Sequence, residues 1–407
     1  MRFKHYRIAD LLDEISMGPF GSNIKKECFV SSGIPVLNGS NLTDVAMNDD
    51  AFRYVTEEKA DSLGKANAHR GDVVVTHRGT LGQISFIPDT SLYDRYVISQ
   101  SQFRFRCNEK VLPEYLTYYF HTRKGKYDLL SNASQVGVPA LARATTTFQQ
   151  IEVDIPDLDE QRKIIGLLEN IREKIELNRK INENLEQQAQ ALYRSLFVNY
   201  DPFGGVKPVD WIDGTIDDLG SEIICGKTPS TKKAEYYGGT TPFITIPDMH
   251  GCVYNVSTER YLSAAGVASQ PKKCLPPNTV CVSCIGTAGL VTLVSEESQS
   301  NQQINSIVPK QEVSAYYIYL LMQTLSETIN KLGQSGSTIV NLNKTQFGKI
   351  QVVIPAPNIM QEFDSLCSPL FETILSNQKE NIKLSELRDA LLPKLMSGEI
   401  DVSDLDL

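Results

Sequence analysis

The chain has 407 residues, of which 41% are hydrophobic, 8% aromatic and 22% charged, and this composition excludes a disordered, collagen-like or purely coiled-coil protein. No apolar run approaches the roughly 20 residues of a membrane span, and the N-terminal MRFKHYRIADLLDEI lacks the apolar core of a secretory signal. We therefore expect two or three globular domains in a cytoplasmic protein without a membrane contact, its eight cysteines reduced.

The net charge of −9, from 40 basic and 49 acidic side chains, argues at first sight against binding to a polyanion such as DNA. The charge is unevenly distributed, however. Residues 357–407 carry 4 basic and 10 acidic side chains, whereas residues 1–156 carry 18 of each and residues 198–356 carry 11 and 13. The overall acidity therefore leaves nucleic-acid binding by the rest of the chain open.

Residues 1–156 are expected to form a mixed α/β domain. The runs IPVLN (34–38), DVVVTH (72–77) and FRFR (103–106) have strand composition and are bounded by turn residues. LPEYLTYYFHT (112–122) has apolar and aromatic residues at helical spacing. The alternating pattern before Pro156 predicts a half-buried closing strand.

A long helix is expected over residues 157–199. Its apolar and asparagine positions alternate spacings of four and three, which is a heptad seam sustained over more than four heptads. The seam residues are Ile164, Leu168, Ile171, Ile175, Asn178, Asn182, Leu185 and Leu192. Polar seam residues weaken a coiled coil but fix its register and partner number. The alternative is a helix that only packs against its own domain.

DPFGGVKPVD (201–210) reads as a linker, and residues 200–356 as a second α/β domain with strands at PFITI (242–246) and TVCVSC (279–284). A helix is expected at 313–326, and a second long helix with an acidic tail over 357–407. The second seam comprises Leu370, Ile374, Asn377, Asn381, Leu384 and Leu391. Pro369 within it predicts either a kink or a helix that begins there after a shorter one.

The two halves are copies of one design. GDVVVTHRGTLG (71–82) matches NTVCVSCIGTAG (278–289) at an offset of 207 residues, and FQQIEVDIP (148–156) matches FGKIQVVIP (347–355) at an offset of 199. The second offset also places Asn178 and Asn182 on Asn377 and Asn381. A repeat of about 200 residues is a duplicated domain, because solenoid periods are about 20–50 residues.

This arrangement resembles the specificity subunit of type I restriction–modification systems. The resemblance is carried by IPDLDEQRKIIGLLENI (155–171), ALYRSLF (191–197) and LRDALLPKLMSGEI (387–400), and by GPFGSNI (18–24), GDVVVTHRGTLG and the region of Pro35. It covers essentially the whole chain. The second copy departs at its helix entry, where PNIMQEF replaces the Pro-x-x-x-Glu-Gln pattern of the first copy.

The resemblance implies two target-recognition domains, each reading half of a split double-stranded DNA site, that alternate with two helices paired as an antiparallel coiled coil in a pseudo-twofold repeat. It also implies that the helices space the domains and dock two methyltransferase subunits, with restriction (motor) subunits joining for cleavage. No cofactor is expected on this chain. S-adenosylmethionine and ATP with Mg are expected on the partner subunits.

Catalytic signatures are missing from the sequence. There is no Walker A loop, Asn-Pro-Pro-Tyr tetrapeptide or Gly-x-Ser-x-Gly elbow, and the five histidines have no metal-like spacing. Cys281 and Cys284 form a Cys-x-x-Cys pair without a matched second pair, so buried strand cysteines are favoured over a metal or redox site. We expect neither a catalytic site nor a metal site.

Candidate DNA contacts are the side chains that bind phosphates or base edges, in segments predicted to be loops. They are Lys25, Lys26, Arg78, Arg143, Lys227, Lys232, Lys233, Asn341, Asn343 and Lys344. Arg123, Lys124 and Lys126 form the densest basic cluster, after a predicted helix whose C-terminal dipole would also favour them. SQSQ (99–102) and SNQQIN (300–305) contribute Gln100, Gln102, Gln302 and Gln303, whose alternative role is to close a turn.

The sequence thus predicts a non-catalytic subunit that recognises DNA and scaffolds other subunits. A protein-only coiled-coil scaffold is one alternative, but it leaves two large divergent domains without a role. A stand-alone DNA-modifying enzyme is disfavoured because the methyltransferase motifs are missing.

Overall fold

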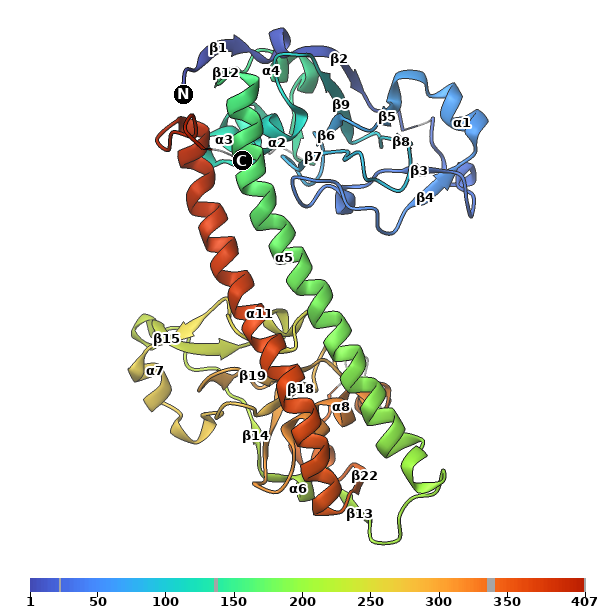
Figure 1. The fold of residues 1–407 in the computed structure, drawn as a ribbon, viewed down its shortest axis with the longest axis vertical. Coiled ribbons are helices and arrows are strands. Elements are labelled where there is room, and N and C mark those ends of the chain that lie inside the picture. The colour runs from blue at the N-terminus through green and yellow to red at the C-terminus, as the bar shows by residue number, and fades with distance from the viewer. Residues whose placement is uncertain (22, 135–137, 335–340, 406–407) are drawn as a thin grey trace. The chain divides into compact units, whose positions relative to one another are not determined.

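The computed structural model describes residues 1–21, 23–134, 138–334 and 341–405 (Figure 1). The chain forms two compact units, the first made of Met1–Glu173 with Ser385–Leu407 and the second of Lys174–Leu384. Both unit boundaries fall inside long helices, so each unit holds a globular part and a stretch of each helix. Within the described ranges, no helix is long and apolar enough to cross a membrane.

The first unit contains two four-stranded sheets, in the orders β2-β9-β6-β7 and β4-β3-β8-β5, with β1 paired antiparallel to β12 and β10 to β11. Its strands are β1 (Lys4–Arg7), β2 (Leu12–Met17), β3 (Ile34–Val36), β4 (Arg53–Val55), β5 (Asn67–His69), β6 (Asp72–Thr76), β7 (Ile84–Phe86), β8 (Arg95–Val97), β9 (Gln102–Cys107), β10 (Ala133–Ser134), β11 (Ala140–Leu141) and β12 (Glu152–Ile155). Its short helices are α1 (Glu57–Ser62), α2 (Pro113–His121), α3 (Arg123–Leu130) and α4 (Ala144–Gln149).

Strand periodicity divides the β2-β9-β6-β7 sheet into an apolar face and a mixed face. Val73 and Phe105 lie directly opposite each other on β6 and β9, and both are fully buried. They pack with Phe120 of α2 and with Leu168 of the long helix in one core. The expected strand at 72–77 and the expected helix at 112–122 are therefore confirmed, and the helix covers the apolar face.

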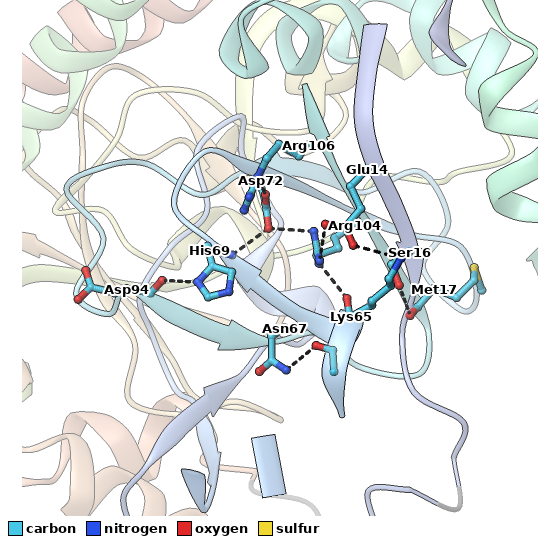
Figure 2. Close-up of polar contacts among 11 residues, drawn as sticks. Glu14, Ser16, Met17, Lys65, Asn67, His69, Asp72, Asp94, Arg104 and Arg106 are labelled. Carbon is cyan, nitrogen blue, oxygen red and sulfur yellow. Dashed lines mark hydrogen bonds and ion pairs between the residues drawn. The ribbon is translucent and has the colours of Figure 1, made fainter. Parts of the chain in front are cut away.

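The other face of this sheet carries a buried ionic group (Figure 2). Asp72 has no exposed surface and accepts from Arg104 at 3.2 Å and from Arg106 at 2.8 Å. Arg104 also pairs with Glu14 at 3.1 Å and donates to the carbonyl of Lys65 at 2.9 Å. The carboxylate and the guanidinium therefore each have several partners, which is the condition under which charges are tolerated in a protein interior.

The second unit contains a five-stranded sheet in the order β14-β21-β18-β19-β16 and a three-stranded sheet in the order β17-β15-β20, and β13 pairs with β22. Its strands are β13 (Ile212–Thr215), β14 (Gly220–Cys225), β15 (Tyr237–Ile244), β16 (Tyr254–Asn255), β17 (Tyr261–Leu262), β18 (Val280–Ser283), β19 (Val291–Val294), β20 (Gln299–Ser300), β21 (Ile304–Pro309) and β22 (Gln351–Ile354). Its short helices are α6 (Ile216–Leu219), α7 (Ala264–Ala268), α8 (Ala315–Thr324), α9 (Ser326–Gly333) and α10 (Lys344–Gly348).

The strand registers confirm the internal repeat. Val73 lies opposite Phe105 in the first unit, and Val280 lies opposite Ile307 in the second. The offset is therefore 207 residues for β6 and β18, and 202 residues for β9 and β21. At these offsets Asp72 and Arg104 correspond to Thr279 and Ser306, so the ionic group belongs to the first unit alone.

The two long helices are α5 (Leu158–Tyr193) and α11 (Pro357–Ser397), and they pair within each unit. In the second unit, Asn178 Nδ2 donates to Asn381 Oδ1 and Asn377 Nδ2 donates to Asn182 Oδ1, both at 2.9 Å. From the first of these pairs to the second, the residue number increases on α5 and decreases on α11, so the two helices are antiparallel. In the first unit, Ile164 packs in the same core as Leu395.

These contacts confirm that the two long helices pair as predicted. All fourteen predicted seam residues are buried or half-buried. The alternative of a helix that begins at Pro369 is wrong, because α11 runs unbroken from Pro357 through Pro369. Pro357 occupies the first helical position, where the missing N–H of proline costs no hydrogen bond.

Candidate nucleic-acid interface

Four segments meet at one end of the β2-β9-β6-β7 sheet in the first unit. The Gly18 N–H donates to the carbonyl of Gln102 and the His77 N–H to that of Ser101, both at 2.8 Å. The Leu141 N–H donates to the carbonyl of His77 at 2.9 Å. These bonds join four segments: residues 18–21 together with 23–26, residues 77–82, residues 99–102 and residues 138–143. We call these segments the first loop cluster.

The second unit repeats this arrangement at the equivalent positions. The Gly226 N–H donates to the carbonyl of Ile304 at 3.0 Å, the Cys284 N–H to that of Gln303 at 2.8 Å, and the Leu342 N–H to that of Cys284 at 3.0 Å. The second loop cluster therefore comprises residues 226–233, 284–289, 300–303 and 341–344. HRGTLG and SCIGTAG thus form a turn that both copies share.

A glycine is required where the first segment of each cluster crosses the turn before β9 or β21. A Cβ atom at Gly18 would lie 2.0 Å from the carbonyl oxygen of Ser99, and one at Gly226 would lie 2.1 Å from that of Asn301. Both distances are far below van der Waals contact, so the close approach of the two backbones depends on the missing side chain.

The four candidate glutamines differ in exposure. Gln100 and Gln302 are exposed, and the Oε1 atom of Gln302 accepts from the hydroxyl of Thr228 at 2.7 Å. Gln102 is fully buried, and its Oε1 atom accepts from the Ser99 N–H at 2.8 Å, so it closes the turn as the alternative role describes. Gln303 is half-buried, with its Oε1 atom accepting from Asn301 at 3.0 Å.

The register also corrects the expected correspondence between the glutamines. At the offset of 202 residues between β9 and β21, Gln100 matches Gln302, but Gln102 matches Ile304 rather than a glutamine. Only one glutamine in each copy thus occupies an equivalent, exposed position. The patterns SQSQ and SNQQIN suggested two matched glutamines in each copy because the sequence alone does not show how the offset changes, from 207 residues at β6 and β18 to 202 residues at β9 and β21.

The basic candidates of the loop clusters are all exposed, and none forms an ion pair with a residue in the described ranges. They are Lys25, Lys26, Arg78 and Arg143 in the first cluster and Lys227, Lys232, Lys233 and Lys344 in the second. Lys233 alone has a local partner, the hydroxyl of Tyr236 at 3.0 Å. Each cluster therefore carries four cationic side chains, and its segments contain no Asp or Glu.

Arg143 has a left-handed backbone conformation, with φ of 48°, at the position before α4. This conformation is uncommon for residues with a side chain and tends to occur at functional positions. The residue in the same position before α10 is Asn343, whose Oδ1 atom accepts from the Gln346 N–H at 3.0 Å, and Lys344 follows it as the first helical residue. Asn343 thus caps a helix, whereas Asn341 is exposed.

The basic cluster of Arg123, Lys124 and Lys126 follows α2, as we expected, but it lies in a further helix that the sequence analysis did not predict. These residues begin α3 rather than end a helix, so the helix dipole there disfavours their charge. Lys124 donates to the hydroxyl of Tyr119 at 3.0 Å, and this bond raises its pKa. Arg123 and Lys126 are exposed and form no ion pair with any residue that the structure describes.

Sequence reasoning missed one residue with clear potential for DNA contact. Phe20 lies in the first loop cluster with 83% of its surface exposed, which is unusual for a large apolar side chain. An exposed aromatic ring can contact a thymine methyl group or stack on a base. The signal was the phrase GPFG, in which glycines hold an aromatic residue in a turn.

The cysteines of the Cys-x-x-Cys pair are buried, as the strand prediction required. Cys281 and Cys284 pack in two different apolar cores, because residues three apart on an extended chain point to opposite faces. Burial raises the pKa of each thiol to about 12. Across the described residues, no group of three or more His, Cys, Asp and Glu side chains could hold a metal ion.

Comparison with known proteins matches most of the chain to one family. The sequence profile of the type I restriction modification DNA specificity domain matches residues 6–187 and 208–386. The chain is 33% identical to the type I restriction enzyme HindI specificity subunit of Haemophilus influenzae, over 95% of this chain and 99% of the relative. It is 24% identical to the MjaIX specificity subunit of Methanocaldococcus jannaschii, over 87% of this chain and 83% of the relative.

The fold agrees with these sequence relationships. The crystal structure of a type I restriction–modification S subunit from M. genitalium superposes with a TM-score of 0.61, covering 97% of this chain and 96% of the other at 14% identity. Two matched domains, two long paired helices and a relative of nearly the same extent lead to one assignment. The chain belongs to the family of type I restriction–modification specificity subunits.

Proposed function

We propose that each loop cluster reads one half of an asymmetric, bipartite site on duplex DNA. The carrying observation is that each cluster presents four cations and no carboxylate in a chain with a net charge of −9. Unpaired, exposed lysine and arginine side chains are the groups that displace counterions from DNA phosphates. Gln100 and Gln302 add an amide that can bond to an adenine edge in the major groove.

The asymmetry of the site follows from side chains that differ on a shared backbone frame. In each cluster an isolated β-bridge joins the turn to the last segment. The bridge pairs Arg78 with Ala140 in the first cluster and Ile285 with Asn341 in the second, so Arg78 corresponds to Ile285 and Ala140 to Asn341. Arg78 and Asn341 are exposed, so the two clusters present different donors and acceptors to a base pair. The two half-sites are therefore expected to differ in sequence.

The paired helices are proposed to dock two methyltransferase subunits and, through them, the restriction (motor) subunits. Both helices carry exposed apolar side chains, with Leu177 on α5 at 53% and Leu366 and Leu387 on α11 at 47% each. Apolar side chains on a solvent-exposed helix surface suit a protein interface. The net charge of −6 in residues 357–407 fits contact with protein rather than with DNA.

This chain is proposed to perform no chemistry of its own. S-adenosylmethionine and ATP with Mg would bind to the partner subunits, and the target adenines would be flipped into a methyltransferase pocket. A stand-alone enzyme is the weaker alternative, because the sequence carries no methyltransferase tetrapeptide or Walker A loop. A protein-only scaffold fits the helices but not two carboxylate-free loop clusters.

The decisive experiment maps methylated adenines across the genome of cells with and without this gene. Loss of methylation at one split motif, with two defined parts and an undefined spacer, is the expected result. Unchanged methylation at every motif would overturn the proposal. Duplex binding by the partner-bound complex that weakens steeply with salt would exclude the protein-only scaffold.

A further inference from the structure

A groove of about 430 Å³ lies in the first unit where α3 begins beside α5 and α11. Arg123 and Lys126 of α3, Arg172 of α5 and Arg388 of α11 line it, with Asp44 and Asp389 as the lining carboxylates. Four cations thus face two anions across segments that are distant in the sequence. A groove of this composition suits an anionic ligand.

The contacts of these four cations within the first unit do not explain why they lie together. Arg123 and Lys126 are exposed, lack an ion pair among the described residues, and lie where the dipole of α3 disfavours a cation. Among the residues that the structure describes, Arg172 forms an ion pair only with Glu169 on its own helix, and Arg388 only with the adjacent Asp389. None of these cations therefore bridges the elements that form the groove.

Helix α3 connects this groove to the first loop cluster. Its last residue, Leu130, lies beside the turn of that cluster, because a Cβ atom at Gly82 would be 3.2 Å from Leu130 Cδ2. The eight residues of α3 span about 12 Å. One DNA strand carries a phosphate about every 3.4 Å of helix axis, so three or four phosphates cover that length. Tyr127, 74% exposed, lies along the same path.

In the described part of the second unit, the helix equivalent to α3 lacks this feature. Helix α9 follows α8 as α3 follows α2, but its charged residues are Glu327 and Lys331, which pair with each other at 3.4 Å. The equivalent helix in the first unit carries three cations and Asp128. The positive groove is thus a property of one copy and not of the shared frame.

We propose that this groove binds backbone phosphates of the DNA strand that flanks the half-site of the first loop cluster. This inference rests on the proposed DNA-reading function and adds that the two units contribute unequally to DNA binding. The first unit supplies an additional phosphate contact that is independent of base sequence, and the second unit relies on its loop cluster. Continuity with the loop cluster through α3 favours DNA over an acidic segment of a partner protein.

The test uses the complex with its methyltransferase partners and two duplexes, one with the methylated motif and one with that motif scrambled. The variant Arg123→Gln/Lys126→Gln/Arg388→Gln removes three groove cations, and Lys331→Gln serves as the matched control on α9. We expect the slope of log K against log salt to fall by about 2–3 for both duplexes. The control should leave both slopes unchanged.

An unchanged salt slope in the variant complex would overturn the phosphate site. Loss of methyltransferase binding with an unchanged slope would also overturn it and assign the groove to an acidic partner surface. Arg123→Gln/Lys126→Gln changes only exposed side chains, so a slope reduction of about 2 remains measurable if the triple variant fails to fold. A wild-type complex that binds neither duplex would instead overturn the proposed function itself.

Discussion

Gln100 and Gln302 occupy the same register position in the two units, two residues before the first strand residue that pairs with Thr76 or Ser283. Each is exposed at the turn that the preceding glycine segment crosses. The two copies thus present a glutamine from the same backbone position, while the residues around that glutamine differ. This relationship makes the two glutamines matched probes of the two half-sites.

Replacing Gln100 with Ala should relax recognition in one half of the methylated motif, and Gln302→Ala should relax the other half. A good amide contact to a base is worth about 1–3 kcal/mol of discrimination. Adenine methylation mapped in cells carrying each variant measures the effect. Gln311→Ala, at an exposed position outside both loop clusters and both long helices, is the control. Identical motif changes in both variants would contradict the assignment of one cluster to one half-site.

Gly18→Ala and Gly226→Ala should each disable one loop cluster while the rest of the chain stays folded. The new methyl group would meet a carbonyl oxygen at 2.0 Å or 2.1 Å, so the crossing segment must move away from the turn. We expect cognate duplex binding to fall by more than tenfold in either complex, with little change in far-UV circular dichroism. Normal binding by both variants would show that the crossing does not position the reading surface.

Locally encoded features were predictable from the sequence. The heptad seam of α5 needs only spacings of three and four, and the asparagines Asn178 and Asn182 reappeared at Asn377 and Asn381. The helix at 112–122 and the strand before Pro156 followed from periodicity in the same way. Several loops were predictable because Gly, Asn and Pro mark turns. Lys344, which we expected in a loop, is instead the first residue of α10.

Features that depend on distant pairing were not predictable. The ionic group needs Asp72 of β6 beside Arg104 of β9, and only the strand register places them together. The same register decides that Gln102 is buried while Gln100 is exposed. Arg123 was correctly expected after the helix at 112–122, but the second helix that it begins was not predicted. The groove and the loop clusters could therefore be identified only from the structure.

The asparagine pair of the helix seam should behave as a unit. Asn178→Leu leaves the Oδ1 atom of Asn381 without its donor, and we expect a loss of about 1–3 kcal/mol in the free energy of unfolding. The double variant Asn178→Leu/Asn381→Leu should recover much of this loss but populate additional oligomers, because apolar seams specify register poorly. Chemical denaturation and sedimentation velocity measure both effects. Additive losses would contradict the pairing.

Stability of the first unit should fall below about pH 6.5 because of His121. Burial lowers the pKa of this imidazole from its ordinary 6.5, and Lys126 and Arg388 lower it further, against the opposing effects of the Ile84 carbonyl and Asp44. The unfolded chain then takes up a proton that the folded one resists, so stability is complete above 6.5 and decreases as pH falls toward the folded value. His121→Gln, which retains a donor for Ile84, should flatten this dependence in thermal unfolding. Equal pH dependence in both proteins would exclude His121 as its source.

Breaking the ionic group should loosen the first unit and not the second. Asp72→Asn removes the charge that compensates Arg104, whose side chain is 5% exposed, and disrupting such a buried pair costs about 3–5 kcal/mol. Because Thr279 stands at the equivalent position of the second unit, hydrogen exchange should accelerate in β6 and β9 but remain slow in β18 and β21. The control Asp61→Asn breaks an exposed pair with Arg95 and should cost less than about 1 kcal/mol. Equal acceleration in both units would mean that they unfold as one, and the ionic group would then stabilise the entire chain.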